Sequence, residues 1–317
     1  MSKPQHVPVL FKEVLEFLNV RPGATVVDAT LGLGGHSSGI ARLLGGKGRL
    51  ICFDRDPQAM ELGRARLAEL KDELGSAMPE VVFEPRAFSE AGTQLGEGSI
   101  DGLLADFGVS SLQLGEAQRG FSFQQDGPLD MRMDTRDGTT AEQVVNQADE
   151  EDLANLIYEF GEERRSRRIA RAIVRARPLR TTAELAEVVA AAAPAIKQPG
   201  GHFIHPATRT FQALRIHVND ELGEIRSLLE SAPRLLKPEG RVALISFHSL
   251  EDRLVKDSLR ELTQQGMYET LTRKPVTAGE AEQEQNPRSR SAKLRAAERT
   301  GMSFTPLVKL KFPRPVY

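Results

Sequence analysis

The chain is poor in cysteine and aromatic residues: it has one cysteine, Cys52, and no tryptophan among 317 residues. A single thiol excludes a disulfide scaffold and a cysteine-ligated zinc site. No apolar run approaches the roughly 20 residues needed to span a bilayer, and the start of the chain lacks the apolar core of a signal peptide. We therefore expect a cytoplasmic protein with no membrane partner.

An excess of charge of one sign is also lacking, since 42 basic and 44 acidic side chains leave a formal net charge of −2. Any contact with nucleic acid must then come from local basic patches. The sequence has no P-loop lysine and no Ser/His/Asp nucleophile elbow, so phosphoryl and acyl transfer have no candidate residues. The closest histidine pair, His202 and His205, has no carboxylate at ligand spacing, and we predict no metal site.

What the sequence does contain is a nucleotide-binding βαβ pattern between residues 25 and 56. A short β-branched run predicts a buried strand that ends in Asp28. A glycine turn at 32–35 leads into a helical stretch, and a second strand at 49–53 is followed by Asp54. Strand, turn, helix, strand and acid within about 30 residues are typical of one nucleotide-binding unit.

The glycine turn discriminates between two nucleotides. The dinucleotide fingerprint G-x-G-x-x-G/A needs a third glycine, and Ser37 stands in its place. The acids that end the two strands suit a different ligand, with an amino-acid moiety for the turn and Asp28 and a ribose diol for Asp54. S-adenosylmethionine has both parts. We favour it over NAD, which stays the alternative.

Two further strands bring candidate residues to the same edge of the predicted sheet. A strand at 81–83 is followed by Phe88, a candidate neighbour of the adenine. A strand at 100–105 ends in Asp106, at the place where strand order is expected to reverse and where open α/β sheets bind ligands. A carboxylate there can accept a hydrogen bond from an exocyclic amine, so Asp106 is the candidate catalytic residue.

Enzymes that methylate amines often carry a D-P-P-Y or related tetrapeptide at this position, and only its first residue is matched, by Asp106. The aromatic side chain that would stack on the target base is therefore open. The candidates are Phe107, Phe121 and Phe247. His248, after the fifth strand, is a candidate proton relay, with a structural hydrogen-bonding role as the alternative.

Residues 112–217 show helical spacing without a clear strand, and a fifth strand follows only at 241–245. This pattern predicts an all-helical domain inserted into a sheet domain made of 1–111 and 218–317. One helical stretch, 163–177, is crowded with arginines, and its net positive charge favours phosphate contacts over a solvated face. The candidate RNA-binding residues are Arg164, Arg167, Arg168, Arg171 and Arg175.

The last part of the chain is predicted to close the sheet. Strands at 268–272 and 304–310 would form a β-hairpin, joined by a long polar connection at 277–301. Because this connection is rich in charge and poor in apolar residues, we expect it to be mobile and to order on a polyanion, or to remain a solvated loop.

Seven stretches of the sequence resemble the MraW (RsmH) family of bacterial 16S rRNA cytosine-N4 methyltransferases, and together they span nearly the whole chain. They are DATLGLGGHS from Asp28, FDRDP from Phe53, LLADFGVSSLQL from Leu103, RGFSFQQDGPLDMRMD from Arg119, HPATRTFQALRIHVNDEL from His205, ISFHSLEDRLVK from Ile245 and NPRSRSAKLRAAER from Asn286. Stretches of this length are far more specific than a glycine turn.

The resemblance implies an α/β fold, namely a class I S-adenosylmethionine-dependent methyltransferase (Rossmann-like) sheet with an inserted all-helical domain. It implies S-adenosylmethionine as donor and a cytidine in the decoding centre of 16S rRNA, in the small ribosomal subunit, as acceptor. The chain would act as a monomer or a homodimer. The donor contacts that carry over from the family are Gly34, Gly35, His36, Asp54, Phe88, Asp106 and Gln113. A non-catalytic rRNA-binding or ribosome-assembly factor, and a methyltransferase of another nucleic acid, are the alternatives.

Overall fold

The computed structural model describes residues 8–194, 196–197 and 203–302. The chain divides into two compact units, which meet in the sequence between Gly108 and Val109 and again between Glu221 and Leu222. We call the part before Val109 together with the part after Glu221 the sheet unit, and the part between them the helical unit. Among the described helices, none is both long enough and apolar enough to cross a membrane.

These boundaries differ by a few residues from those expected at 111/112 and 217/218. Val109 packs against the apolar core of the helical unit. At the other boundary, the Asn219 side chain donates a hydrogen bond to the Met131 carbonyl at 2.7 Å. These contacts tie both ends of the inserted segment to the helical unit, and no local sequence pattern reports them.

A seven-stranded sheet forms the centre of the sheet unit. Its strands are β1 (Thr25–Asp28), β2 (Arg49–Phe53), β3 (Glu80–Glu84), β4 (Ile100–Asp106), β7 (Leu236–Ser246), β8 (Tyr268–Thr270) and β9 (Lys293–Arg299). The order across the sheet is β3-β2-β1-β4-β7-β9-β8, so it reverses between β1 and β4. Strands β1 to β4 and β7 run parallel, and β9 is antiparallel to both its neighbours. All five strands predicted for the parallel part are confirmed.

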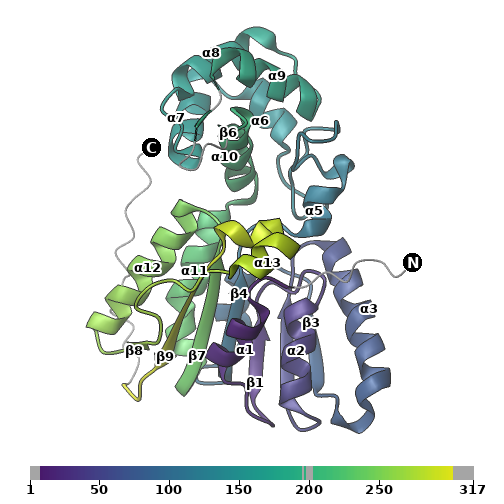
Figure 1. The fold of residues 1–317 in the computed structure, drawn as a ribbon, viewed down its shortest axis with the longest axis vertical. Coiled ribbons are helices and arrows are strands. Elements are labelled where there is room, and N and C mark those ends of the chain that lie inside the picture. Colours follow the sequence, from purple (N-terminus) through teal and green to yellow (C-terminus); the bar gives the residue numbers. More distant parts are fainter. Residues whose placement is uncertain (1–7, 195, 198–202, 303–317) are drawn as a thin grey trace. The chain divides into compact units, whose positions relative to one another are not determined.

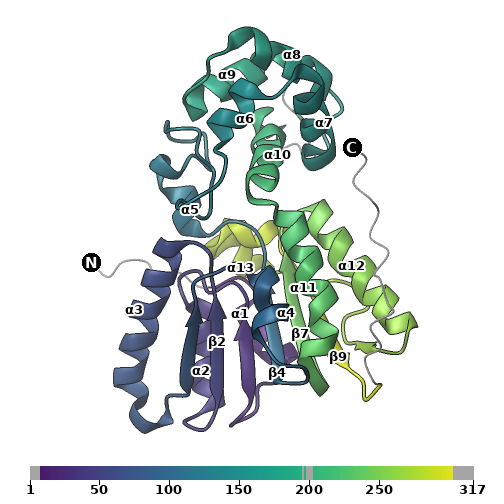
Figure 2. The same ribbon diagram turned by 180° about the vertical axis from the view of Figure 1, so that it is seen from behind.

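Helices cover both faces of this sheet, which is why its central strands are continuous apolar runs. The helices are α1 (Phe11–Leu18), α2 (Gly35–Leu44), α3 (Pro57–Leu74), α4 (Ala91–Gln94), α11 (Glu221–Leu235), α12 (Ser249–Gln264) and α13 (Glu280–Gln285), with the 3-10 turns η1 (Gly75–Ala77), η2 (Phe88–Glu90) and η4 (Pro287–Ser291). Figures 1 and 2 show α1 and α2 on one face and α4 and α11 on the other. Leu50, Leu103 and Leu104 are completely buried between these layers.

The prediction of a mobile connection over 277–301 is wrong for its last third, which forms β9. Its short apolar residues Leu294, Ala296 and Ala297 are fully buried. The charged residues between them are paired, because Arg295 Nε donates to an Asp252 oxygen at 2.7 Å. The predicted partner strand at 304–310 lies outside the described residues, and β8 pairs with β9 instead.

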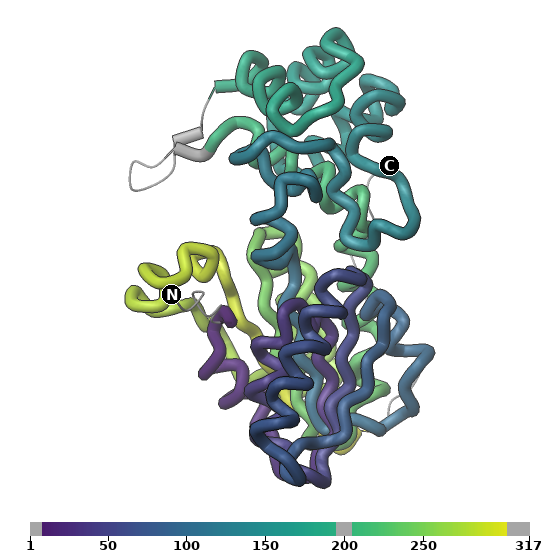
Figure 3. Tube along the Cα trace, turned by 90° about the vertical axis from the view of Figure 1, so that its right-hand side faces the viewer, coloured from purple at the N-terminus to yellow at the C-terminus, as the bar shows by residue number. Residues whose placement is uncertain are grey.

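The segment before β9 packs against the beginning of the described chain. Figure 3 shows the purple α1 region and the yellow α13 region side by side. The backbone N–H of Leu10 donates to Glu282 Oε1 at 2.8 Å, and Leu10, Ala278 and Ala292 share one apolar cluster. Residues far apart in the sequence thus close one side of the sheet unit.

The helical unit surrounds a core of its own. Its elements are α5 (Ser111–Gly115), η3 (Ala117–Arg119), α6 (Ala141–Gln147), α7 (Glu150–Gly161), α8 (Ser166–Ala176), α9 (Thr182–Ala192), β5 (Ile196–Lys197), β6 (Phe203–Ile204) and α10 (Ala207–Asn219). Thr140 and Thr181 begin α6 and α9 as parts of capping boxes. The expectation of an all-helical insertion is wrong in one respect, since β5 and β6 form a two-residue antiparallel pair.

Candidate functional site

Three aspartates lie where neighbouring parallel strands of the sheet unit end. Asp28 ends β1, Asp106 ends β4, and Asp54 follows β2 directly. Because these strands run in one direction, the three carboxylates lie at one edge of the sheet, on both sides of the point where strand order reverses. Asp28 is buried and the other two are half-buried. The sequence prediction placed all three at this edge.

The Asp28 carboxylate holds the glycine turn together. One oxygen accepts a hydrogen bond from the Thr30 backbone N–H at 3.1 Å, and the other accepts one from the Ser37 hydroxyl at 2.6 Å. Burial raises the pKa of Asp28 to about 6, while these two hydrogen bonds act in the opposite direction. Both oxygens are therefore engaged within the turn itself.

Asp54 is anchored by the backbone on both of its oxygens. Oδ2 accepts from the Gly32 N–H at 2.8 Å and Oδ1 from the Asp56 N–H at 2.9 Å. Burial raises the pKa of Asp54 to about 6, and the two hydrogen bonds partly offset that shift. A carboxylate oxygen has two acceptor sites, so each oxygen keeps one for a further donor.

The glycine turn at 32–35 packs closely against neighbouring residues. Gly34 has a φ of +72°, which glycine adopts without strain, and it caps the start of α2. A Cβ atom on Gly35 would lie 2.4 Å from the Pro8 ring. His36, in the first turn of α2, is buried, and its ring lies 6.0 Å from that of Phe11. The predicted glycine and histidine positions are thus gathered at one helix start.

Asp106 differs from the other two because one of its oxygens has no donor in the part of the chain that the structure describes. Its backbone N–H donates to Thr30 Oγ1 at 2.7 Å, which ties the end of β4 to the turn. Oδ1 is buried and has no hydrogen-bond partner among the described residues. Burial raises the pKa of Asp106 to about 7; the positive charge of Arg288 opposes this shift, and the negative charges of Asp28 and Glu251 add to it. The site therefore offers a buried acceptor to an incoming N–H group.

The aromatic candidates near Asp106 are not equally accessible. Phe107 is only 2% exposed and its ring packs against that of Phe88, with 5.8 Å between centroids. Phe121 is buried in the core of the helical unit. The expectation that either could serve as an open stacking surface is wrong for this conformation. Phe247 and Phe88 are half-buried and keep exposed ring area.

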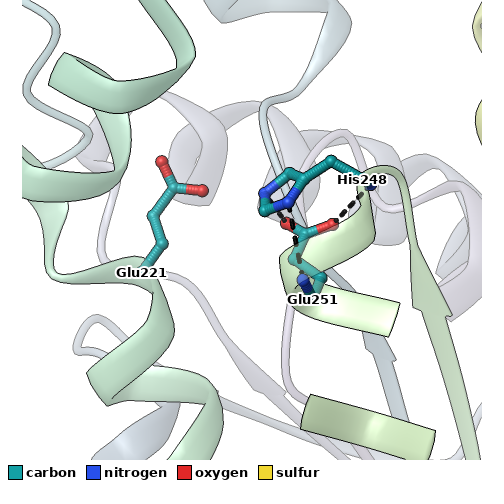
Figure 4. Close-up of side chains that lie close together, drawn as sticks. All are labelled: Glu221, His248 and Glu251. Atoms are coloured by element: carbon teal, nitrogen blue, oxygen red, sulfur yellow. Dashed lines mark hydrogen bonds and ion pairs between the residues drawn. The ribbon is translucent and has the colours of Figure 1, made fainter. Parts of the chain in front are cut away.

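The first turn of α12 contains a carboxylate that sequence reasoning missed. Glu251 is completely buried, and its Oε2 accepts hydrogen bonds from the backbone N–H groups of Phe247 at 2.7 Å and His248 at 3.2 Å. Figure 4 shows the His248 ring turned toward this carboxylate, with Nε2 3.1 Å from Oε1. The two residues form a capping box at the start of α12. The spacing of three residues before an apolar helix was the signal that could have revealed it.

Gln113 belongs to the helical unit, unlike the other predicted donor contacts. Its Oε1 accepts a hydrogen bond from the Ser110 N–H at 2.9 Å. The Ser110 hydroxyl accepts one from the Gln113 N–H at 3.2 Å, which completes a capping box at the start of α5. The structure therefore gives this side chain a local role in ordering the chain just after β4.

The predicted RNA-binding arginines are all exposed on α8 and the turn before it. The opposite face of α8 carries Ile169 and Ile173, which are completely buried in the core of the helical unit. Arg171 is paired with Glu150 at 3.3 Å. The amphipathic pattern that predicted an exposed basic face is confirmed, whereas its role in binding RNA stays a prediction.

The histidine pair considered for a metal is only partly described, because His202 lies outside the described residues. Nδ1 of His205 accepts a hydrogen bond from the Ala207 N–H at 3.2 Å. The His205 ring contacts that of Phe123, with 4.7 Å between centroids. Both contacts place the His205 side chain at the start of α10.

Comparison with known proteins gives one matching family model and several similar proteins. A family model described as the MraW methylase family matches residues 3–300. Ribosomal RNA small subunit methyltransferase H of Acidobacterium capsulatum is 67% identical over 299 residues, which cover 94% of this chain and 100% of that protein. The protein of the same name in Koribacter versatilis is 58% identical over 294 residues, which cover 93% and 94%. A solved SAM-dependent O-methyltransferase of Thermotoga maritima aligns with 95% of this chain and 69% of its own, at 11% identity and a TM-score of 0.43.

Proposed function

The chain belongs to the MraW methylase family, and we propose that it methylates N4 of a cytidine in the decoding centre of 16S rRNA. The methyl donor of this family, which has a class I Rossmann-like sheet, is S-adenosylmethionine. The relatives that are 67% and 58% identical bear the name of a small-subunit rRNA methyltransferase, which supports the same class of substrate here. The choice of an amine as acceptor is carried by one observation, the buried and unpartnered Oδ1 of Asp106.

The residues at the carboxyl edge of the sheet fit this donor. Gly34 and Gly35 let the turn pack closely at the start of α2, with Gly35 against the Pro8 ring. Asp54 follows β2 with one acceptor site free on each oxygen, which matches the two hydroxyls of a ribose. Phe88 keeps exposed ring area beside the end of β4, where an adenine would find an apolar neighbour. His36, in the first turn of α2, completes the proposed donor contacts of the sheet unit, and the role of Gln113 stays a prediction.

S-adenosylmethionine supplies an electrophilic methyl group, so the residues of the chain mainly position the amine and exclude water. Cytosine N4 is a weak nucleophile because its lone pair is delocalised into the ring. A hydrogen bond from N4–H to Asp106 Oδ1 would favour a pyramidal nitrogen and would offset its developing positive charge. With its pKa raised by burial to about 7, the Asp106 carboxylate is suited to accept the proton that the amine releases.

The helical unit is the proposed RNA-recognition part of the chain. Its exposed arginines on α8 provide the phosphate contacts that a protein of balanced net charge needs. The target base must leave any stack to reach the edge of the sheet, so we propose that the substrate nucleotide is flipped or already unpaired. This function places the protein in the cytoplasm, on the small ribosomal subunit.

A methyl-transfer assay tests the proposal. Small subunits that lack the modification are incubated with tritiated donor, and the modified nucleoside is identified by mass spectrometry. We expect N4-methylcytidine with the unaltered chain. With Asp106→Ala we expect donor binding within a few-fold and turnover lower by at least about a hundredfold. Methylation at a ring carbon, or full turnover by Asp106→Ala, would contradict the proposal. Binding of rRNA without any S-adenosylhomocysteine release would favour a non-catalytic factor.

A further inference from the structure

The helical unit contains a pocket of about 460 Å³ that the proposed chemistry does not use. It lies where α7 ends and α8 begins, and its size falls in the range of small-molecule sites. The residues of its lining that matter here are Asn155, Tyr158, Arg164, Arg165, Arg167 and Arg168. Arginines and one aromatic ring therefore share a single concave surface.

Tyr158 is an unusual residue for the place it occupies. It is 59% exposed, although its neighbours Leu153 and Ile157 on the same helix are completely buried in the core. Packing of the helical unit does not need this ring, and an exposed aromatic face is a platform on which a nucleic-acid base of any kind can stack.

The arginines of the pocket carry charge that the described residues do not neutralise. None of Arg164, Arg165, Arg167 and Arg168 has a carboxylate oxygen within ion-pair distance among those residues. By contrast, Arg171, further along α8, is paired with Glu150 at 3.3 Å. A guanidinium group matches the geometry of a phosphate, with two parallel hydrogen bonds. The pocket thus combines an anion site with a stacking surface.

Glu163 is buried beside the pocket, where it holds the backbone of the pocket in place and does not neutralise the pocket arginines. Glu163 is 3% exposed; its Oε1 accepts a hydrogen bond from the Arg165 backbone N–H at 2.9 Å, and its Oε2 lies 3.6 Å from Arg209. Arg209 also donates to the Glu162 carbonyl at 2.9 Å, and Gln212 donates to the Phe160 carbonyl at the end of α7 at 2.9 Å. The turn between α7 and α8 is therefore fixed from α10, which lowers the ordering cost of binding.

We propose that this pocket binds one unpaired nucleotide of the RNA, with its base stacked on Tyr158 and its phosphates held by the arginines. The inference rests on the proposed function, because it takes RNA as the substrate, and it adds a site that anchors the strand through a base as well as its backbone. Because stacking does not read the identity of the base, the pocket accepts any unpaired nucleotide.

The test compares two labelled oligomers of about 12 units, oligouridylate and an abasic ribose phosphate of equal length, by fluorescence anisotropy on the full chain. We expect the unaltered chain to bind oligouridylate about tenfold more tightly than the abasic oligomer. Tyr158→Ala should remove this preference, and Tyr158→Phe should keep it. The matched control is Leu62→Ala, which removes a 41% exposed apolar side chain from the sheet unit and should change neither affinity.

The arginine variant separates charge from stacking. Replacing Arg167 and Arg168 by glutamine should weaken binding of both oligomers by the same factor and lower the salt slope by about two. A Tyr158→Ala chain that keeps the full preference for oligouridylate would overturn the inference. A second result would also overturn the inference. If polyglutamate binds the unaltered chain but not the arginine variant, and oligouridylate binds both chains equally, the pocket recognises an acidic peptide.

Methyl transfer to small subunits is measured on the same proteins and tests the proposed function separately. If the unaltered chain transfers methyl groups and Tyr158→Ala still prefers oligouridylate to the abasic oligomer, this inference alone is wrong. Loss of base preference in Tyr158→Ala supports the pocket, whatever atom the enzyme methylates.

Discussion

Replacing Asp106 by asparagine should stabilise the ligand-free fold at pH 8 while it impairs methyl transfer. Burial raises the pKa of Asp106 from 3.8 to about 7, and Oδ1 is buried without a hydrogen bond. Between pH 3.8 and about 7, Asp106 therefore keeps its proton in the folded chain but has lost it in the unfolded chain. The contribution of Asp106 to the stability of the fold thus falls as the pH rises from about 4 to 7 and is constant above that range. Asparagine is neutral throughout and escapes this loss.

The size of the effect follows from the shift in pKa. A rise from 3.8 to about 7 corresponds to about 4 kcal/mol of unfolding free energy, at 1.36 kcal/mol for each pKa unit. The new amide brings an N–H₂ group to a place that held an oxygen, which costs about 1–2 kcal/mol if one donor is left unpaired. The net gain expected at pH 8 is about 2 kcal/mol, and it should shrink to nearly zero at pH 5.

Urea unfolding followed by far-UV circular dichroism, without donor, measures this gain at the two pH values. Asp54→Asn is the matched control, because both Asp54 oxygens accept backbone N–H groups, at 2.8 and 2.9 Å. Its amide would turn a donor toward a donor at a cost of about 1–3 kcal/mol. This cost offsets the gain of about 3 kcal/mol that follows from the raised pKa of Asp54, so the control variant should show little or no net stabilisation at pH 8. An Asp106→Asn chain that is no more stable than the unaltered chain at pH 8, or equally stabilised at pH 5, would refute the reasoning.

Three further predictions concern the same edge of the sheet. Affinity for S-adenosylmethionine, which carries a net positive charge, should rise from pH 5 to pH 8 as Asp54 ionises, because burial raises the pKa of Asp54 to about 6; calorimetry that gives a flat profile would contradict this. Asp54→Ala should weaken donor binding about tenfold or more, and unchanged affinity in the same assay would remove Asp54 from the ribose role. Thr30→Val should cost about 1–3 kcal/mol in urea unfolding because the Asp106 N–H loses its acceptor at 2.7 Å, whereas Thr30→Ser should keep most of the stability.

Local pattern was enough to predict the parallel half of the sheet. The strand at 49–53 has the predicted bounds, since it is a short apolar run with a clear stop residue. The position of Asp54 after such a strand then follows from chain direction alone. Features whose causes lie within one βαβ unit were therefore accessible from the sequence.

Features that depend on partners far away in the sequence could not be predicted from local pattern. Strand β9 reads as a polar stretch, and it becomes a strand only because Arg295 finds Asp252, 43 residues away, and because β7 offers an unpaired edge. The link from Thr30 to the Asp106 N–H joins residues 76 positions apart. The burial of Phe107 against Phe88 likewise results from tertiary packing, which no aromatic pattern reports.

The three carboxylates of the edge differ in how the fold uses their oxygens, and this difference supports the roles proposed for them. Both oxygens of Asp28 are engaged by the glycine turn, so it shapes the site. Asp54 is held by two backbone N–H groups but keeps acceptor sites for a ligand. Asp106 alone retains a buried oxygen without a donor among the described residues. In the proposed function, the N–H group of the acceptor base relieves the cost of that arrangement, so binding energy becomes available where methyl transfer is proposed to occur.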